Sequence, residues 1–273
     1  MTLHRHGDRC HETVGQLPRL SHMSLLTRLL GAFGTRRGTR PLPTLGPASN
    51  IDEVISSMRM IQASLDDNDG VAHFNRMYLH VTEGVAAAVA RRDFEDRAFL
   101  ERLDVVFANY YFRALAQCAG PDACPRAWQP LIECRAKRRI APIQFALAGM
   151  NAHINYDLAL AVVDTCVELG CEPRRDTPQY RDFLLVNALL AKAKDEIEPT
   201  FKRGLLGVID NLLGRGDEAA EMWSIERARD AAWVNAEALW KLKDDPLLSE
   251  RFTLILARTV GLAGRGLLIP SAL

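Results

Sequence analysis

The segment from Ala148 to Ala161 sets four polar side chains, Asn151, His153, Asn155 and Asp157, into an otherwise apolar stretch. A buried polar group without a hydrogen-bond partner costs about 1–3 kcal/mol, so these residues must serve a network, a metal or a ligand. On a helix, His153 and Asp157 are four residues apart and point at a common spot. There the histidine can act as a general base, while the two asparagines stabilise developing charge.

One long helix must carry these side chains, and the sequence predicts it over residues 142–169. Pro142 suits a first helical turn, and Gly170 suits the position just after the last. At 100° per residue, Gln144 and the two asparagines share one face, with His153 and Asp157 nearly opposite. The remaining circumference is largely apolar, which is typical of a helix surrounded by other helices. We therefore expect it at the centre of the fold.

Two further predicted helices supply possible metal ligands. In the helix over 71–91, His80 and Glu83 form an i, i+3 pair that presents an imidazole nitrogen and a carboxylate oxygen together. In the helix over 96–118, Asp104 shares its face with apolar residues and is expected to point inward, where its charge needs a partner. The five candidate ligands, two imidazoles and three carboxylates suited to zinc, iron or manganese, are His80, Glu83, Asp104, His153 and Asp157.

Each of these candidates also has a structural interpretation. Arg76 could pair with Glu83 at the surface or with Asp104 inside the protein. Asn151 and Asn155 could donate to Asp104 instead. A fully satisfied polar network of this kind needs neither metal nor ligand.

Composition limits the classes of protein. The chain has 273 residues, 48% of them hydrophobic, so it can bury a large core. Basic and acidic residues both number 34, and a formal net charge of zero argues against a nucleic-acid partner. Residues 1–50 carry seven arginines and two acids, so a basic tail precedes an acidic body. The six cysteines lack paired C-x-x-C spacing and are expected to be reduced thiols, although Cys118 and Cys124 flank a turn that could bring them together.

The first 46 residues are expected to be a flexible basic arm, because no hydrophobic period follows Phe33. The apolar run over 24–33 is interrupted by Arg28 and is too short for a signal-peptide core or a transmembrane span. We therefore expect a cytoplasmic protein without a transmembrane segment.

The rest of the chain, residues 47–273, is predicted to form a single all-α domain of many helices around the long central one. No stretch shows sustained β alternation, and no repeat of fixed period is visible. Besides the three helices above, the predicted segments are 51–65, 127–137, 177–196, 202–213, 217–243 and 246–262, the last followed by a glycine-punctuated tail.

Four segments resemble a family of bacterial proteins known only as a domain of unknown function: Phe74–Leu79, Leu103–Asn109, Ala148–Asn155 and Gly264–Leu268. The resemblance spans residue 51 to the end of the chain. It implies a single helical domain and carries no activity, so it assigns no catalytic role to any residue.

These observations predict an enzyme that acts on a small organic or lipid-like molecule in a central polar pocket, either with a divalent metal such as zinc or iron to activate water or with no metal. The alternative is a non-catalytic helical protein that binds an apolar ligand or a protein partner, its polar residues forming a satisfied core network.

Overall fold

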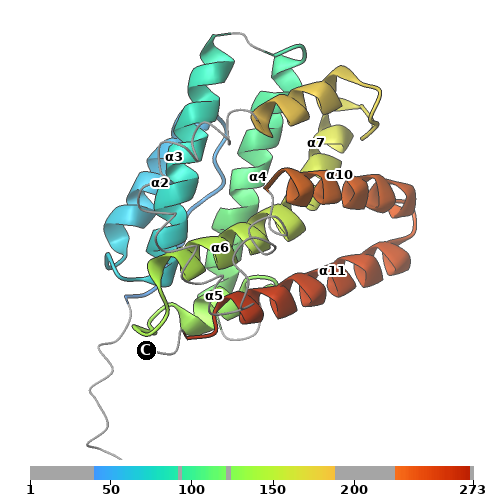
Figure 1. Ribbon diagram of the computed structural model, residues 1–273. Coiled ribbons are helices and arrows are strands. Elements are labelled where there is room, and N and C mark those ends of the chain that lie inside the picture. Colours follow the sequence, from blue (N-terminus) through green and yellow to red (C-terminus); the bar gives the residue numbers. More distant parts are fainter. Residues whose placement is uncertain (1–39, 92–93, 121–123, 188–224, 271–273) are drawn as a thin grey trace, which may run out of the picture. The chain divides into compact units, whose positions relative to one another are not determined.

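The computed structural model describes residues 40–91, 94–120, 124–187 and 225–270 (Figure 1). Within these ranges the regular structure is helical and contains no strand, which confirms the all-α prediction. Residues 178–187 are helical as well. The named helices are α2 (Ile51–Ser64), α3 (Gly70–Ala90), α4 (Arg97–Cys118), α5 (Gln129–Cys134), α6 (Pro142–Ala152), the π-helical turn η1 (His153–Asp157), α7 (Leu158–Leu169), α10 (Ile225–Leu242) and α11 (Pro246–Leu267).

Side-chain caps begin several of these helices. Asn50 accepts a hydrogen bond from the Glu53 amide at 2.9 Å, and Glu53 in turn accepts one from the Ser49 amide at 2.7 Å. Asp96 and Asp245 cap α4 and α11 in the same manner. Such caps satisfy backbone donors that have no partner inside the helix, so they fix where each helix begins.

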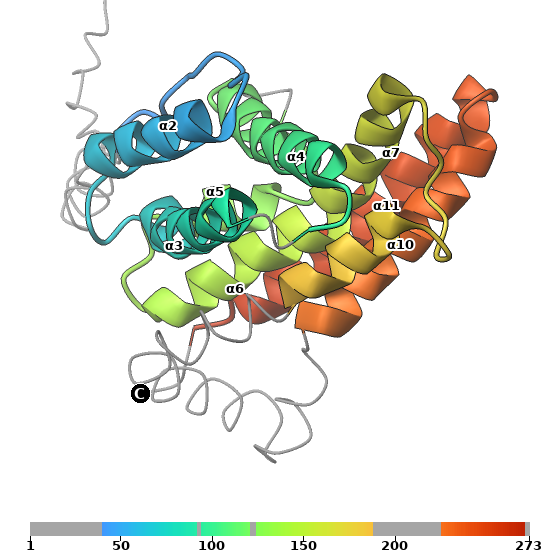
Figure 2. The same ribbon diagram turned by 90° about the horizontal axis from the view of Figure 1, so that it is seen from above.

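The central helix lies where the sequence predicts it. It runs from Pro142 through α6, η1 and α7 to Leu169, and Gly170 ends it with a φ of 65°. Its first half, α6, packs against α3 and α11, whereas its second half, α7, packs against α4 and α10 (Figure 2). This confirms a multi-helix fold built around one long helix.

The C-terminal helix is longer than the sequence suggests. The prediction ended it at residue 262 because of the glycines that follow, but α11 continues through Gly264 and Gly266 to Leu267. Close packing explains the small residue at 261: a Cβ atom there would overlap the backbone carbonyl oxygen of Arg126. In this helix glycine therefore permits close approach rather than ending the helix.

The predicted arm, residues 1–46, lies mostly outside the described residues. Its described part is packed: Leu42 is buried, and the carbonyl oxygen of Arg40 accepts a hydrogen bond from Arg135 at 2.7 Å. The folded body thus includes residues 40–46. The predicted helix over 202–213 and the ends of its neighbours, 188–196 and 217–224, also fall outside the described residues.

No helix in the described ranges combines the length and apolar composition needed to cross a membrane.

Candidate functional site

His153 lies at the centre of an aromatic cluster contributed by four parts of the chain. Its imidazole stacks on the Phe107 ring, with centroids 3.6 Å apart and planes 5° from parallel. Tyr78 meets it edge-on with centroids 4.6 Å apart, and the ring centroids of Phe74 and Trp128 lie at 5.9 and 6.0 Å. With 2% of its surface exposed, His153 is as buried as the apolar core around it.

Asp157 orients this imidazole. Its Oδ2 lies 2.9 Å from Nδ1 of His153 and accepts a second hydrogen bond, at 3.0 Å, from Nε1 of Trp128. With Asp157 ionised, Oδ2 accepts from both Trp128 and His153, and His153 then carries its proton on Nδ1 and a lone pair on Nε2. The predicted pairing of His153 with Asp157 is therefore observed.

Burial sets the ionisation of this pair. It lowers the pKa of His153 well below the ordinary value of 6.5, so the imidazole is neutral at physiological pH. It also raises the pKa of Asp157 well above the ordinary value, an effect opposed by the hydrogen bond from Trp128 and by the charge of Arg113. The result is an imidazole that can accept a proton at Nε2.

The backbone at this point is the π-helical turn η1, which begins at His153 and ends at Asp157. Its closing hydrogen bond runs from the Leu158 amide to the His153 carbonyl oxygen, five residues back. Single π turns inside α-helices occur frequently at functional sites. Here the turn contains both members of the buried pair.

A cavity of about 120 Å³ lies beside His153, between α3, α4, the central helix and α10. Its wall is mainly apolar and includes Phe74, Val81, Leu103 and Met150. The polar or charged groups on the wall come from four residues: Tyr78, Asp104, His153 and Arg229. The cavity is thus an apolar chamber with polar groups from three helices and the π turn.

Asp104 and Arg229 line the same cavity without a direct ion pair between them in the described structure. Burial raises the pKa of Asp104 to about 7, an effect that the charge of Arg229 opposes. Burial also lowers the pKa of Arg229 to about 10. The Arg229 guanidinium donates to Asn187 Oδ1 at 2.8 Å and to the Phe183 carbonyl oxygen at 2.9 Å, so part of its donor set is already used.

Arg229 was not among the candidates from the sequence, which considered Arg76 as the cation for Asp104. Arg76 instead lies 3.8 Å from Asp67 at the surface. A signal for Arg229 existed: at helical spacing it shares a face with Ile225, Trp233 and Ala236, and an arginine on a predicted core face requires a buried partner.

Asn151 and Asn155 lie on the other side of the central helix. Asn151 donates to the Val260 carbonyl oxygen of α11 at 2.9 Å and accepts from Asn155 at 3.2 Å. Neither lines the cavity. The prediction that these asparagines stabilise charge beside His153 is therefore wrong, because Asn151 instead bonds to α11 and Asn155 bonds to Asn151.

The five predicted metal ligands are not brought together. Glu83 is half-exposed and pairs with Arg59 at 2.8 Å, and neither it nor His80 lines the cavity. In the part of the chain that the structure describes, no three His, Cys, Asp or Glu side chains are close enough to hold one metal ion. These residues do not fit a zinc or iron site, although Asp104 and His153 share the cavity.

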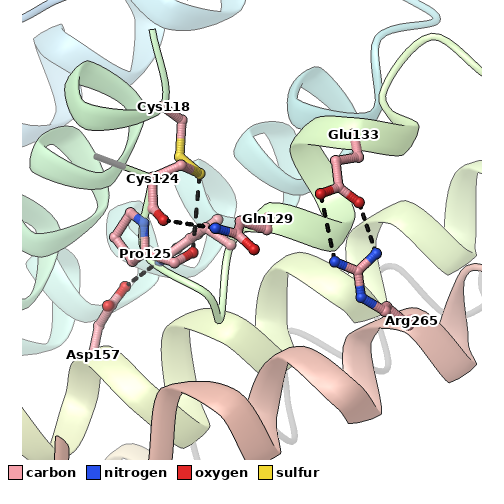
Figure 3. Close-up of a disulfide and its surroundings, with 8 residues drawn as sticks. Cys118, Cys124, Pro125, Gln129, Glu133, Asp157 and Arg265 are labelled. Carbon is pink, nitrogen blue, oxygen red and sulfur yellow. Dashed lines mark hydrogen bonds and ion pairs between the residues drawn. A yellow bond between two sulfur atoms is a disulfide. The ribbon is translucent and has the colours of Figure 1, made fainter. Parts of the chain in front are cut away.

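A disulfide between Cys118 and Cys124 fixes the segment that carries Trp128 (Figure 3). Gln129 supports the same segment by donating to the Cys124 carbonyl oxygen at 3.1 Å, and Asp157 of the central helix lies next to it. The expectation that these two cysteines are reduced is therefore wrong. The two sulfurs are bonded to each other, a possibility that their spacing had left open.

The fold and the cavity define an all-helical protein with a buried His–Asp pair beside an apolar chamber. Over residues 51–270 the chain matches a family of unknown function, DUF5995, and it belongs to that family. This confirms the resemblance seen in the sequence. No curated protein and no solved structure gives a significant match.

Proposed function

We propose that this protein binds a small, mainly apolar molecule with one hydrogen-bond donor in the cavity beside His153. One observation carries the proposal. His153 Nε2 and Asp104 Oδ2 are buried on the cavity wall, and neither has a hydrogen-bond partner among the described residues. Buried polar atoms are normally paired, and each unpaired one costs about 1–3 kcal/mol. A ligand that donates to either atom would recover part of that cost.

The size of the chamber limits the ligand. A dry apolar cavity of about 150 Å³ accommodates benzene, so about 120 Å³ suits a single ring or a short branched chain. A molecule with a long acyl chain would have to extend beyond it. Within the expected class of small organic or lipid-like ligands, the geometry therefore favours the smallest members.

The unpaired atoms also indicate the polarity of the ligand. Neutral His153 presents a lone pair at Nε2, and the ionised Asp104 carboxylate presents an oxygen, so both favour a ligand that donates. The Tyr78 hydroxyl on the same wall, also unpaired among the described residues, can donate to the ligand or accept from it. Arg229, on the same wall, disfavours a cation. A neutral hydroxyl compound fits these constraints best.

Ordered water is the competing occupant, because it too can donate to both atoms. A chamber of this volume holds about four waters at about 30 Å³ each, but its mainly apolar wall offers them few partners. Phenol and toluene separate the two occupants, since they have nearly the same shape and differ in one hydroxyl group.

Titration calorimetry with these two probes tests the proposal. We expect both to bind, and phenol to bind more tightly even though toluene is more apolar. Val81→Phe should abolish binding of both by filling the chamber. Val167→Phe, the matched control at an exposed position, should leave it unchanged. Absence of binding at millimolar concentrations, or binding that survives Val81→Phe, would overturn the proposal.

General base catalysis on the bound molecule is a second candidate function, favoured by the 2.9 Å contact between His153 and Asp157. An imidazole held by a carboxylate can take a proton from a bound hydroxyl group or water. Activity on any substrate should then stay constant as pH falls through 6.5 and decrease only well below that value, where the folded His153 becomes protonated. His153→Gln should remove that activity while still binding toluene.

The cytoplasmic bacterial setting and the absence of a nucleic-acid partner are also proposals. Zero net charge supports the second, whereas the Cys118–Cys124 disulfide weighs against a reducing compartment. Alkylation of intact cells followed by mass analysis of the tryptic peptide over 114–126, which holds both cysteines, decides the compartment. Alkylated cysteines would indicate the cytoplasm, and an intact disulfide would exclude it.

A further inference from the structure

The C-terminal end of α7 brings two free cysteines together. Gly170 adopts a left-handed conformation, and behind it the Cys171 amide donates to the Cys166 carbonyl oxygen at 3.0 Å. The Gly170 amide donates to Val167 at 3.4 Å. These are the two hydrogen bonds of a Schellman motif, in which the side chains of the first and last residues characteristically meet.

The separation of the two residues suits a disulfide. With standard covalent distances on either side of the 3.0 Å hydrogen bond, the Cα atoms of Cys166 and Cys171 lie within about 7 Å. Protein disulfides span Cα separations of about 4.4–6.8 Å. The thiols also interact: burial, and then the neighbouring Cys171 thiol, raises the pKa of Cys166.

The two thiols differ in access. Cys166 is completely buried in the core, whereas Cys171 is half-exposed at the start of the loop. An external reagent therefore reacts with Cys171 first. Cys166 then lies next to the product formed on the Cys171 sulfur and can react with it.

We propose that Cys166 and Cys171 form a site of reversible oxidation, closed by exchange with a small disulfide such as oxidised glutathione. The Cys171 thiolate attacks one sulfur of that reagent, which forms a mixed disulfide and releases one glutathione thiolate. The Cys166 thiolate then attacks Cys171 Sγ and releases the second. The two cysteines lose two electrons to the reagent, and their two protons pass to the glutathione thiolates.

Closure fixes the last turn of α7, which packs against α4 and α10. The C-terminal end of α4 already carries the Cys118–Cys124 bond, so the new bond would be the second to fix the end of a core helix in this protein. Constraint of the unfolded chain should raise the melting temperature by a few degrees.

Peptide mapping of the native full-length chain tests this proposal without reference to any ligand. Trypsin releases residues 140–174 as one peptide that contains Cys166 and Cys171 and no other cysteine. After treatment with oxidised glutathione and alkylation under denaturing conditions, we expect this peptide without alkyl groups and two hydrogen masses lighter than the dithiol. Dithiothreitol should restore it.

Two controls make the result specific. In Cys171→Ser, Cys166 should remain alkylated, because its only route to oxidation is through its neighbour. Cys134 is partly exposed like Cys171 and lies in the separate peptide over 127–135, where one glutathione at most can attach. Two alkyl groups on the 140–174 peptide, or a glutathione that persists on Cys171 beside an alkylated Cys166, would overturn the proposal.

Discussion

The two sides of the central helix carry similar polar residues in contrasting surroundings. On the side that faces α11, Gln144 donates to the Leu267 and Ile269 carbonyl oxygens at 2.9 and 2.7 Å, and Asn151 donates to Val260. On the side that faces the cavity, His153 and Asp104 each keep a buried polar atom without a partner in the described structure. The α11 side pairs these polar groups, whereas the cavity side leaves three unpaired among the described residues, the third being the Tyr78 hydroxyl.

This contrast separates a structural network from a candidate site. Side chains that cap the carbonyl oxygens of another helix fix its register, and their removal leaves a buried acceptor unpaired. Unpaired buried atoms beside a cavity lower the stability of the empty protein rather than add to it, and they are free to bind a ligand. We therefore expect mutations on the α11 side to reduce stability and those on the cavity side to change pH dependence and binding.

The largest loss of stability is expected at the closest backbone contact of α11. Gly261→Ala places a Cβ atom against the Arg126 carbonyl oxygen, a backbone group that cannot rotate away, and should cost about 3 kcal/mol. Gly266→Ala in the same helix meets nothing within 4 Å and should gain about 0.5 kcal/mol. Urea unfolding measures both. Equal stability of the two variants would show that α11 does not pack as described.

The next effect concerns Asn151 on the same side. Asn151→Ala should cost about 2 kcal/mol, because it leaves the Val260 carbonyl oxygen buried and unpaired. Asn155→Ala, which removes a half-buried donor to Asn151, should cost less than about 1 kcal/mol. Toluene binding should survive in both variants, since neither residue lines the cavity. Loss of binding at unchanged stability would erase the distinction between the two sides.

On the cavity side, the contribution of His153 to the free energy of unfolding should depend on pH. Its folded pKa lies well below the unfolded value of 6.5, so the unfolded state binds the extra proton first. The contribution of His153 to stability is complete above pH 6.5 and falls below it, by about 1 kcal/mol per pH unit until the folded imidazole titrates. His153→Gln should lack this component in urea unfolding at pH 7.0 and 5.5. Parallel losses in the two proteins would show that His153 is not buried as a neutral group.

The smallest change in stability is expected at Asp104, whose stability contribution depends on pH in the opposite direction to that of His153. Its pKa rises from 3.8 to about 7 on folding, so the folded state binds more protons between these values and stability falls as pH rises through this window. Asp104→Asn should therefore gain stability relative to wild type between pH 5 and pH 8. We expect about 0.5 kcal/mol, because part of this side chain faces solvent. Melting temperatures at the two pH values check the sign.

The sequence predicted the central helix well because its boundaries depend on local chemistry, Pro142 at the start and Gly170 after the end. The pairing of His153 with Asp157 followed from spacing along one helix. Contacts between helices could not be read in this way. The partner of Asn151, the Val260 carbonyl oxygen, lies more than one hundred residues away on another helix. Because the sequence does not show this partner, it predicts that Asn151 belongs to the site.

The two errors on α3 and α11 have physical causes as well. Glu83 looked like a ligand because His80 is three residues away, but Arg59 of α2 pairs with it at the surface. The glycines of α11 looked like a helix end because glycine disfavours helices in isolation. Packing of α11 against the segment before Trp128 outweighs that preference. A single sequence does not reveal this packing.

The π turn at His153 has a consequence for how the central helix meets its neighbours. A π turn holds one residue more than an α turn, so the chain beyond it is rotated by about 100° from where a continuous α-helix would place it. The two halves of one helix are thereby out of phase, and each half directs its apolar face to a different pair of neighbours. Removing a single residue from this turn would bring the halves back into phase and turn the wrong face of α7 toward α4 and α10.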